Sequence, residues 1–450
     1  MSSYSMNQSK QCEIYALLFL WYNGFMSRKK KRQKGKNRIS ARYSFLRPFL
    51  VTLCMVTAGG ILGLAAYQWI IEPTKPADNS HFQLAREVMD SGSVKDEEIQ
   101  IEEILAVNNR YADVLSDPDY MVENNIYAKD AVSPEQVTIT FAGDILFDEN
   151  YAVMAGVVQS GGDIASGISP DLIREMKSAD VMMLNNEFPY SDRGEPLEDK
   201  QFTFRAKTSA VSYLNDLGVD IVSLANNHAY DYGENAFLDT MATLEDAGVV
   251  YVGAGRNLNE ARRPVYYIIN NVKIAIVSAT QIERLDNPDT KGATDSSPGV
   301  FRCWNGDNLL ETVRDAKENS DFVIAYLHWG TENVEDIDWA QEKQAAEVAE
   351  AGADIIIGDH PHCLQQISVV KGVPVIYSLG NFWFNSKPLD TGMVKVILDE
   401  NGLRSYQFIP CRQSGSKTTL VQGEEKKRVL DYMRSISAGV QIDEDGYVTW

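Results

Sequence analysis

Hydrophobic residues recur in short runs from Gln136 onwards, and most of these runs follow a stretch with helical spacing. The segments VSYLNDLGVDIVSLANN and AEVAEAGADIIIGDH share one order: a helical segment, a glycine, then a buried strand. This alternation is typical of a layered α/β domain. The pattern predicts strands at Val137–Ala142, Val181–Leu184, Ile221–Leu224, Val249–Val252, Phe322–Leu327, Ile355–Ile357 and Val373–Tyr377, a hairpin over Tyr266–Val277 turning at Asn270-Asn271, and a helix over Glu234–Leu244.

The N-terminal part of the chain has a different pattern. Residues 28–47 contain ten Lys or Arg and no acid, and residues 49–71 contain no charge. A helix of this length spans roughly 34 Å, enough to cross a hydrocarbon core of about 30 Å. We therefore expect a cytoplasmic basic segment at 1–48, a transmembrane helix at 49–71, and the main domain outside the cell. A cleaved signal peptide is the alternative, but the apolar run is long and Tyr67-Gln68-Trp69 lacks a small-residue cleavage pattern.

Residues 72–133 predict an acidic extracytoplasmic stalk. Residues 72–135 contain fifteen acids and five basic residues, and 96–116 have partial helical spacing. The chain carries −21 in total and residues 1–71 carry +10, so residues 72–450 carry −31. This charge argues against nucleic acid as a partner. Translation is hypothesised to start at Met26, which opens the basic segment.

Polar side chains follow five of the predicted strands at the point where each strand ends. In open α/β sheets, ligands bind beyond the carboxyl ends of the strands. Four of the five histidines of the chain occur at these positions. Mixed carboxylate, amide and imidazole ligands suit a divalent ion such as Mn, Fe or Zn better than a thiolate-preferring metal. The strand-end segments are Gly143-Asp144, Asn185-Asn186-Glu187, Asn226-Asn227-His228, His328-Trp329-Gly330 and Gly358-Asp359-His360-Pro361-His362.

The motifs TFAGDILF, NNEFP, SLANNHAYDYG, YLHWG, GDHPHCLQ and YSLGNFWFN resemble those of the CapA/PgsA family of poly-γ-glutamate capsule-synthesis proteins, within the calcineurin-like metallophosphoesterases. The resemblance covers about residues 136–385. It implies an α/β sandwich of two sheets flanked by helices over residues 134–390, with a C-terminal extension at 391–450 that completes the domain. It also implies a single-pass membrane protein that works with membrane-bound polymer-synthesis subunits.

The resemblance further implies a site for two divalent ions at the strand ends. Glu187 would bridge the ions, and His228 would act as a general acid or oxyanion partner. One position departs from the phosphoesterase pattern, because Leu146 stands where a histidine ligand is expected, which puts two-metal catalysis in doubt. The remaining implied ligands are Asp144 and His362 for one ion, and Asn227, His328 and His360 for the other.

Three further residues are candidates for substrate binding: Arg205 in FTFRAK, Asn226, and Asn381 in SLGNFWF. Each has a simpler alternative, namely a surface ion pair for Arg205, a helix-turn cap for Asn226 and a turn role for Asn381. Trp329, Phe382 and Trp383 are expected in the core or the cleft wall.

Two classes of function remain open. The first is a membrane-anchored, metal-dependent hydrolase or transferase in which His228 protonates the leaving group. The second is a non-catalytic subunit that handles poly-γ-glutamate during synthesis or export. The −31 charge counts against simple binding of a polyanion, and Leu146 counts against efficient phosphatase chemistry.

Overall fold

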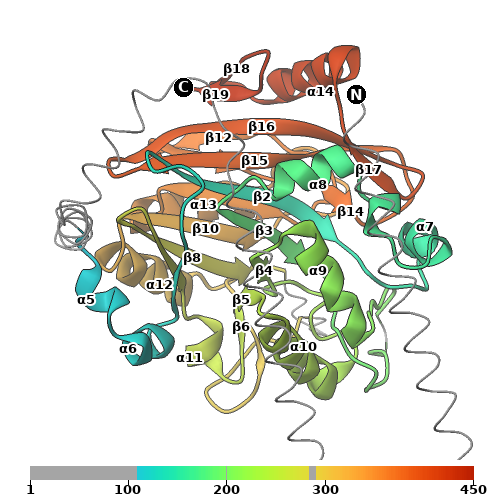
Figure 1. Cartoon of the computed structure of the whole chain (residues 1–450), viewed down its shortest axis with the longest axis horizontal. Coiled ribbons are helices and arrows are strands. Elements are labelled where there is room, and N and C mark those ends of the chain that lie inside the picture. The colour runs from blue at the N-terminus through green and yellow to red at the C-terminus, as the bar shows by residue number, and fades with distance from the viewer. Residues whose placement is uncertain (1–108, 199, 283–289) are drawn as a thin grey trace, which may run out of the picture. The chain divides into compact units, whose positions relative to one another are not determined.

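The computed structural model describes residues 109–198, 200–282 and 290–450 (Figure 1). The predicted cytoplasmic segment, transmembrane helix and residues 72–108 of the predicted stalk lie outside these ranges. Within the described ranges, no helix is both long and apolar enough to cross a membrane.

Two β-sheets form the centre of the described part. The seven-stranded sheet has β8, β10, β11 and β13 in parallel, with β7 antiparallel to β8, β12 antiparallel to β13, and β1 parallel to β7. Its order is β1 (Ile126–Ala128), β7 (Val265–Ile269), β8 (Val272–Thr280), β10 (Phe322–His328), β11 (Ile355–Asp359), β13 (Val373–Ile376) and β12 (Ile367–Val370).

The ten-stranded sheet places β2 to β5 in parallel, and β15 joins it antiparallel to β2, followed by β16, β19 and β18, each antiparallel to the strand before it. Its path is β18 (Gln441–Ile442), β19 (Tyr447–Thr449), β16 (Gly402–Ser414), β15 (Leu389–Asp399), β2 (Val137–Ile145), β3 (Val181–Asn186), β4 (Ile221–Ser223) and β5 (Val250–Val252), while β14 (Asn381–Trp383) pairs with β2 and β17 (Lys417–Leu420) pairs with β16. β6 (Ala254–Gly255) and β9 (Gly299–Val300) form a separate pair.

Side chains alternate along the strands between two apolar layers. On β10, Phe322, Ile324 and Tyr326 face the core between the sheets, whereas Val323, Ala325 and Leu327 face the outer helices. The result is a sandwich of two sheets flanked by helices, as expected. The outer layers are formed by α7 (Ala155–Gln159), α8 (Pro170–Met176), α9 (Ser212–Leu217) and α10 (Gly233–Ala247) on one sheet, and by α11 (Leu258–Ala261), α12 (Asp307–Glu318) and α13 (Trp339–Ala351) on the other.

The predicted strands are present, and the predicted hairpin turns at Asn270 and Asn271, both with positive φ. Their ends differ from the prediction. β2, β3, β10 and β11 extend through the polar residues, so Asp144, Asn186, His328 and Asp359 belong to the strands. Parallel pairing continues through these residues, regularly between β10 and β11 and with a register shift between Phe141 and Asp144 on β2, and it fixes their relative positions more firmly than loops would.

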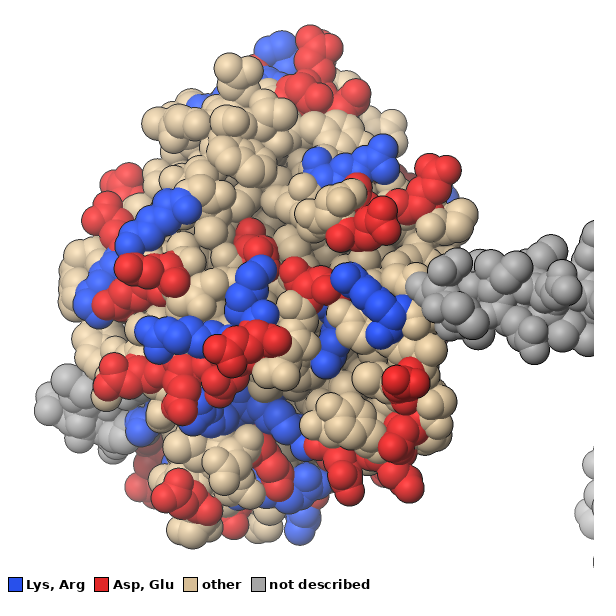
Figure 2. Space-filling view, turned by 90° about the vertical axis from the view of Figure 1, so that its left-hand side faces the viewer, with Lys and Arg blue, Asp and Glu red and all other residues tan. Residues whose placement is uncertain are grey.

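The C-terminal part of the predicted stalk is folded onto the domain, which corrects its boundary. α5 (Ala112–Leu115) and α6 (Pro118–Glu123) precede β1, which pairs with β7. The Tyr111 hydroxyl donates to Asp321, and Lys129 pairs with Asp220. These cross-links are tertiary and have no local signature in the sequence. On the face that carries α5, α6 and α12, basic and acidic side chains are intermixed (Figure 2).

The C-terminal segment is part of the same fold. β15 pairs with β2 from Met393 to Leu398, and α14 (Gly423–Ile436) contributes Val429, Leu430 and Met433 to the core between the sheets.

Candidate metal centre

The ends of the parallel strands bring carboxylates and imidazoles together in a buried cluster. Three groups have ligand atoms that all lie within 4.8 Å of one another. Glu187 belongs to two of them, which matches the bridging position that the resemblance implies. The groups are Glu187 with His328 and His360, Asp144 with Glu187 and His362, and Asp144 with His328 and Asp359.

The Nε2 atom of His328 lies at the centre of the first group. It is 2.9 Å from the side-chain oxygen of Asn227, 3.0 Å from Nδ1 of His360 and 3.7 Å from a carboxylate oxygen of Glu187. Ligands about 2.1 Å from one ion are roughly 3.0–3.4 Å apart in octahedral or tetrahedral geometry. The distances to Asn227 and His360 therefore fit a shared ion, and the Glu187 oxygen lies slightly further away.

The protonation of His328 strengthens this fit. Its Nδ1 lies 2.9 Å from a carboxylate oxygen of Asp359, which fixes the proton on Nδ1 and leaves the lone pair on Nε2. Burial lowers the pKa of His328 to about 3, so the ring is neutral near pH 7. Nε2 of His328 and the oxygens of Asn227 and Glu187 then face one another as acceptors, an arrangement that a cation between them would stabilise.

Glu187 provides the clearest sign that the cluster suits a cation. It is fully buried, and neither carboxylate oxygen has a hydrogen-bond partner within the described part. Burial, followed by the negative charges of Asp144 and Asp359, raises the pKa of Glu187 well above its ordinary value. An unpartnered buried carboxylate is costly, whereas metal ligation would satisfy it. The residues present therefore fit a divalent ion.

The Asp144 group is more fully hydrogen-bonded. One carboxylate oxygen of Asp144 accepts from the Asn185 amide at 2.9 Å, and the other lies 3.0 Å from Nδ1 of His362. Burial lowers the pKa of His362, but the bond and charge of Asp144 outweigh it, and the net shift is upward. Leu146 packs in the apolar layer against the outer helices. The Asp144 group thus has fewer free acceptors than the His328 group.

His228 lies beside the cluster, with its ring held from two sides. Its Nδ1 is 2.8 Å from Asp231, and its ring lies 4.3 Å from that of Phe204. Burial lowers the pKa of His228, although Asp231 acts in the opposite direction. The ring is therefore neutral near pH 7, with Nδ1 donating to Asp231 and Nε2 available as an acceptor.

The loop after β11 places two imidazoles by an unusual backbone. His360 has φ 95° and His362 has φ 60°, values in the left-handed region that disfavour residues other than glycine. The Asn333 amide donates to the Pro361 carbonyl at 2.8 Å and holds the loop in this form. Such strain is concentrated at functional sites.

Comparison with known proteins identifies the family of this chain. A family model described as bacterial capsule synthesis protein PGA_cap matches residues 138–386, more than half of the chain. The chain belongs to the PGA_cap family. The matched range spans Asp144, Glu187, Asn227, His328 and the loop after β11.

Two relatives found by sequence comparison are named as capsule or PGA biosynthesis proteins. The capsule biosynthesis protein CapA of Bacillus anthracis is 32% identical over 307 residues, which cover 66% of this chain and 72% of that protein. The PGA biosynthesis protein CapA of Bacillus subtilis is 29% identical over 286 residues, 62% of this chain and 72% of that protein. Among solved structures, a 5'-nucleotidase of Candida albicans has a TM-score of 0.34 at 12% identity and covers 63% of this chain and 53% of its own.

Three residues of this PGA_cap chain were predicted to bind substrate: Arg205, Asn226 and Asn381. The structure places each of them in a different environment. The side-chain amide of Asn226 donates to the side-chain oxygen of Asn185 and to the Asn186 carbonyl. Its oxygen accepts from the backbone N–H of His228, so Asn226 stabilises the turn. Asn381 lies on β14, level with Asp144, and its buried side chain lies against His362, whose pKa it helps to raise, so it remains a candidate for ligand contact.

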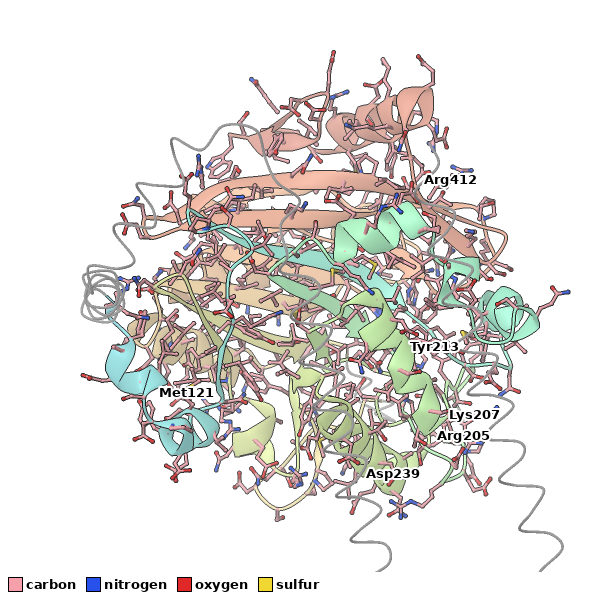
Figure 3. The ribbon with its side chains drawn as sticks, in the orientation of Figure 1. Met121, Arg205, Lys207, Tyr213, Asp239 and Arg412 are labelled. Atoms are coloured by element: carbon pink, nitrogen blue, oxygen red, sulfur yellow. The ribbon has the colours of Figure 1, made fainter. Side chains whose placement is uncertain are left out.

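The structure does not bring Arg205 to the metal cluster. Its guanidinium lies over the Tyr232 ring, 4.2 Å from the centroid, and donates to the Gly194 carbonyl. Its neighbour Phe204 faces His228, so the two consecutive side chains point to opposite sides. Arg205 and Lys207 instead line a 170 Å³ surface pocket beside α9 (Figure 3).

Sequence reasoning missed three residues of the site. Asp359 occurs inside the quoted GDHPH motif, but its contact with His328 depends on the register of β10 and β11. Asn185 precedes Glu187 and links Asp144 to Asn226. Lys200 lies in a polar loop without any motif and reaches the site only through the tertiary fold. For Asp359 and Asn185, the strand-end position was the available signal.

Proposed function

We propose that the chain acts outside the cell membrane in the synthesis or export of a poly-γ-glutamate capsule, and that it uses a divalent-metal site with hydrolase-like chemistry. Membership of the PGA_cap family supports the capsule role, as do the names of the Bacillus relatives. The predicted anchor at 49–71 supports the location. Protease added to intact, wall-stripped cells should then remove the described domain, whereas full protection would contradict this orientation.

The single observation that carries the metal site is Glu187, a fully buried carboxylate without a hydrogen-bond partner within the described part. Asn227, His328, His360 and Glu187 would hold one ion, and Asp144, His362 and Glu187 would hold a second. A bound divalent ion supplies Lewis-acid polarisation of a carbonyl or phosphoryl oxygen and stabilises developing negative charge.

The chain's own residues supply positioning and proton transfer. Asp231 accepts from Nδ1 of His228, which leaves Nε2 as the atom that receives or passes on a proton during bond cleavage. The ring of Phe204 packs on that of His228, and the ring of Phe384 lies 5.1 Å from that of His362. These apolar contacts restrict the imidazoles to one orientation and exclude water from one side of them.

A second candidate is a metal-stabilised subunit without catalysis. Leu146 favours it, because this apolar side chain occupies the position of an expected ligand, and both carboxylate oxygens of Asp144 already have partners. In this alternative the ion would stabilise the strand ends, and the surface of the domain would bind the polymer or the membrane-bound synthesis subunits.

Replacing Glu187 in the native host tests the proposed function. A deletion strain complemented with the parent chain should make capsular poly-γ-glutamate, whereas Glu187→Gln should not restore it. A deletion that leaves the amount and chain length of the polymer unchanged would contradict the capsule role.

A further inference from the structure

Lys200 is a buried lysine in an otherwise exposed loop. Its neighbours Gln201 and Phe202 are exposed, yet the Lys200 side chain is only 7% exposed. Lys207, seven residues later, is 59% exposed and pairs with Glu149 at the surface. Burying an ammonium group is costly unless its partners compensate, so the contacts of Lys200 must account for its position.

The Lys200 ammonium holds both ends of one short turn. It donates to the main-chain carbonyl of Asn227 and pairs with the carboxylate of Asp231. Asp231 is fully buried and also accepts from the Phe204 amide at 2.7 Å and lies 2.8 Å from Nδ1 of His228. The Lys200 ammonium therefore links the two ends of the turn, the main-chain carbonyl of Asn227 and the side chain of Asp231.

This turn carries two residues of the site. The side-chain oxygen of Asn227 lies 2.9 Å from Nε2 of His328, and His228 lies between the two positions that Lys200 holds. We propose that Lys200 is a positioning residue of the metal centre, because it fixes the turn that places Asn227 towards the ion and His228 beside the cluster. This inference rests on the proposed metal site and adds a residue that no motif identifies.

The charge of Lys200 supports the same role. Its ammonium pairs with Asp231, which holds Nδ1 of His228, and it donates to the carbonyl of Asn227, whose side chain faces His328. A fixed positive charge in this position lowers the cost of gathering carboxylates in a buried cluster.

The simpler alternative is that Lys200 only anchors its loop to the domain. The Leu197 amide also donates to the Asp231 carbonyl, at 2.9 Å, so the loop has a further attachment. The two roles differ in one respect. A loop anchor affects folding, whereas a positioning residue changes the geometry around the ion.

Cobalt substitution of the full-length chain separates these roles, because the visible absorption of Co²⁺ reports its ligand geometry. The comparison uses the parent chain, Lys200→Met, Lys200→Arg and the exposed control Lys207→Met, with Co²⁺ as the probe. We expect Lys200→Met to change the spectrum and to weaken Co²⁺ binding by about 10–100-fold, as for losses of groups that orient metal ligands. Lys200→Arg, which retains the charge and donors, should stay close to the parent, and Lys207→Met should match it.

The outcomes are distinguishable. If the parent binds Co²⁺ but Lys200→Met has the same spectrum and affinity, the inference is overturned while the metal site stands. Equal weakening in Lys200→Met and Lys200→Arg would overturn it as well, because the charge would then not matter. If the parent binds no Co²⁺, the proposed metal site itself fails. Should Lys200→Met not fold, as judged by circular dichroism, Lys200→Gln takes its place under the same criteria.

Discussion

His328 and Asp359 are paired across the neighbouring parallel strands β10 and β11, and Nδ1 of His328 lies 2.9 Å from an Asp359 carboxylate oxygen. This contact directs Nε2 of His328 towards Asn227 and His360. A carboxylate that orients a histidine in this way raises its basicity as a metal ligand. The pairing of two strands thereby determines the direction of one ligand atom.

Asp359→Ala should weaken metal binding by about 10–100-fold, because His328 would lose the group that fixes its tautomer and ring orientation. Competition against a metal-sensitive dye measures the change. Asp354→Ala is the matched control, since Asp354 directly precedes β11 but pairs with Lys317 near the surface. Equal affinity in parent and Asp359→Ala would exclude this role for Asp359.

Glu187→Gln should have opposite effects on stability with and without metal. In metal-containing buffer the variant should be less stable than the parent, because a shared ligand is lost. With a chelator present it should be more stable by about 1–3 kcal/mol, because glutamine lacks the carboxyl group whose ionisation is disfavoured by burial. Thermal unfolding in the two buffers measures both effects, and the exposed control Glu347→Gln should change neither. Destabilisation in both buffers would assign Glu187 to packing.

The same variant gives a pH prediction for the metal-free chain. The folded pKa of Glu187 is raised above its ordinary value of 4.5, so its stabilising contribution is complete below about pH 4.5 and is lost as pH rises through the folded pKa. Because glutamine does not titrate, the stability advantage of Glu187→Gln in chelator should grow from pH 5 to pH 8. A difference that stays constant over this range would show that the pKa of Glu187 is not raised in the folded, metal-free chain.

Much of the fold could be predicted from local pattern. Buried runs such as Phe322–Leu327 and Ile355–Ile357 correspond to strands because apolar side chains on both faces require cover on both faces. The predicted position of the site followed from the rule that the carboxyl ends of parallel strands lie at the same edge of a sheet, where ligands bind. The hairpin was visible because Asn270 and Asn271 tolerate positive φ.

The remaining features depend on tertiary register, which a single sequence does not contain. The contact of Asp359 with His328 exists only because β10 and β11 pair in one register. The docking of Tyr111 on Asp321 joins residues far apart in the chain, so the predicted stalk extended too far. Arg205 resembled an anion-binding residue, but its side chain faces Tyr232 because its neighbour Phe204 packs on His228.

His228→Ala and Asp144→Ala distinguish an enzyme from a scaffold when compared in the same strain. An enzyme should lose polymer synthesis or release in both, since a proton-transferring group typically contributes about 10²–10⁴-fold. A metal-stabilised scaffold should lose function only in Asp144→Ala, because His228 is not among the groups that could hold the ion. The amount and chain length of poly-γ-glutamate are the measurements. Normal polymer with His228→Ala would exclude catalysis through this imidazole.

Metal analysis of the purified full-length chain tests the central claim most directly, since every role assigned above depends on an ion beside Glu187. Plasma emission spectroscopy should find Mn, Fe or Zn at about one or two equivalents in the parent, and a marked loss in Glu187→Gln, because a buried site with this many converging ligands retains its ion. Less than about a tenth of an equivalent in the parent, after purification without chelator and reconstitution with each metal, would contradict the account.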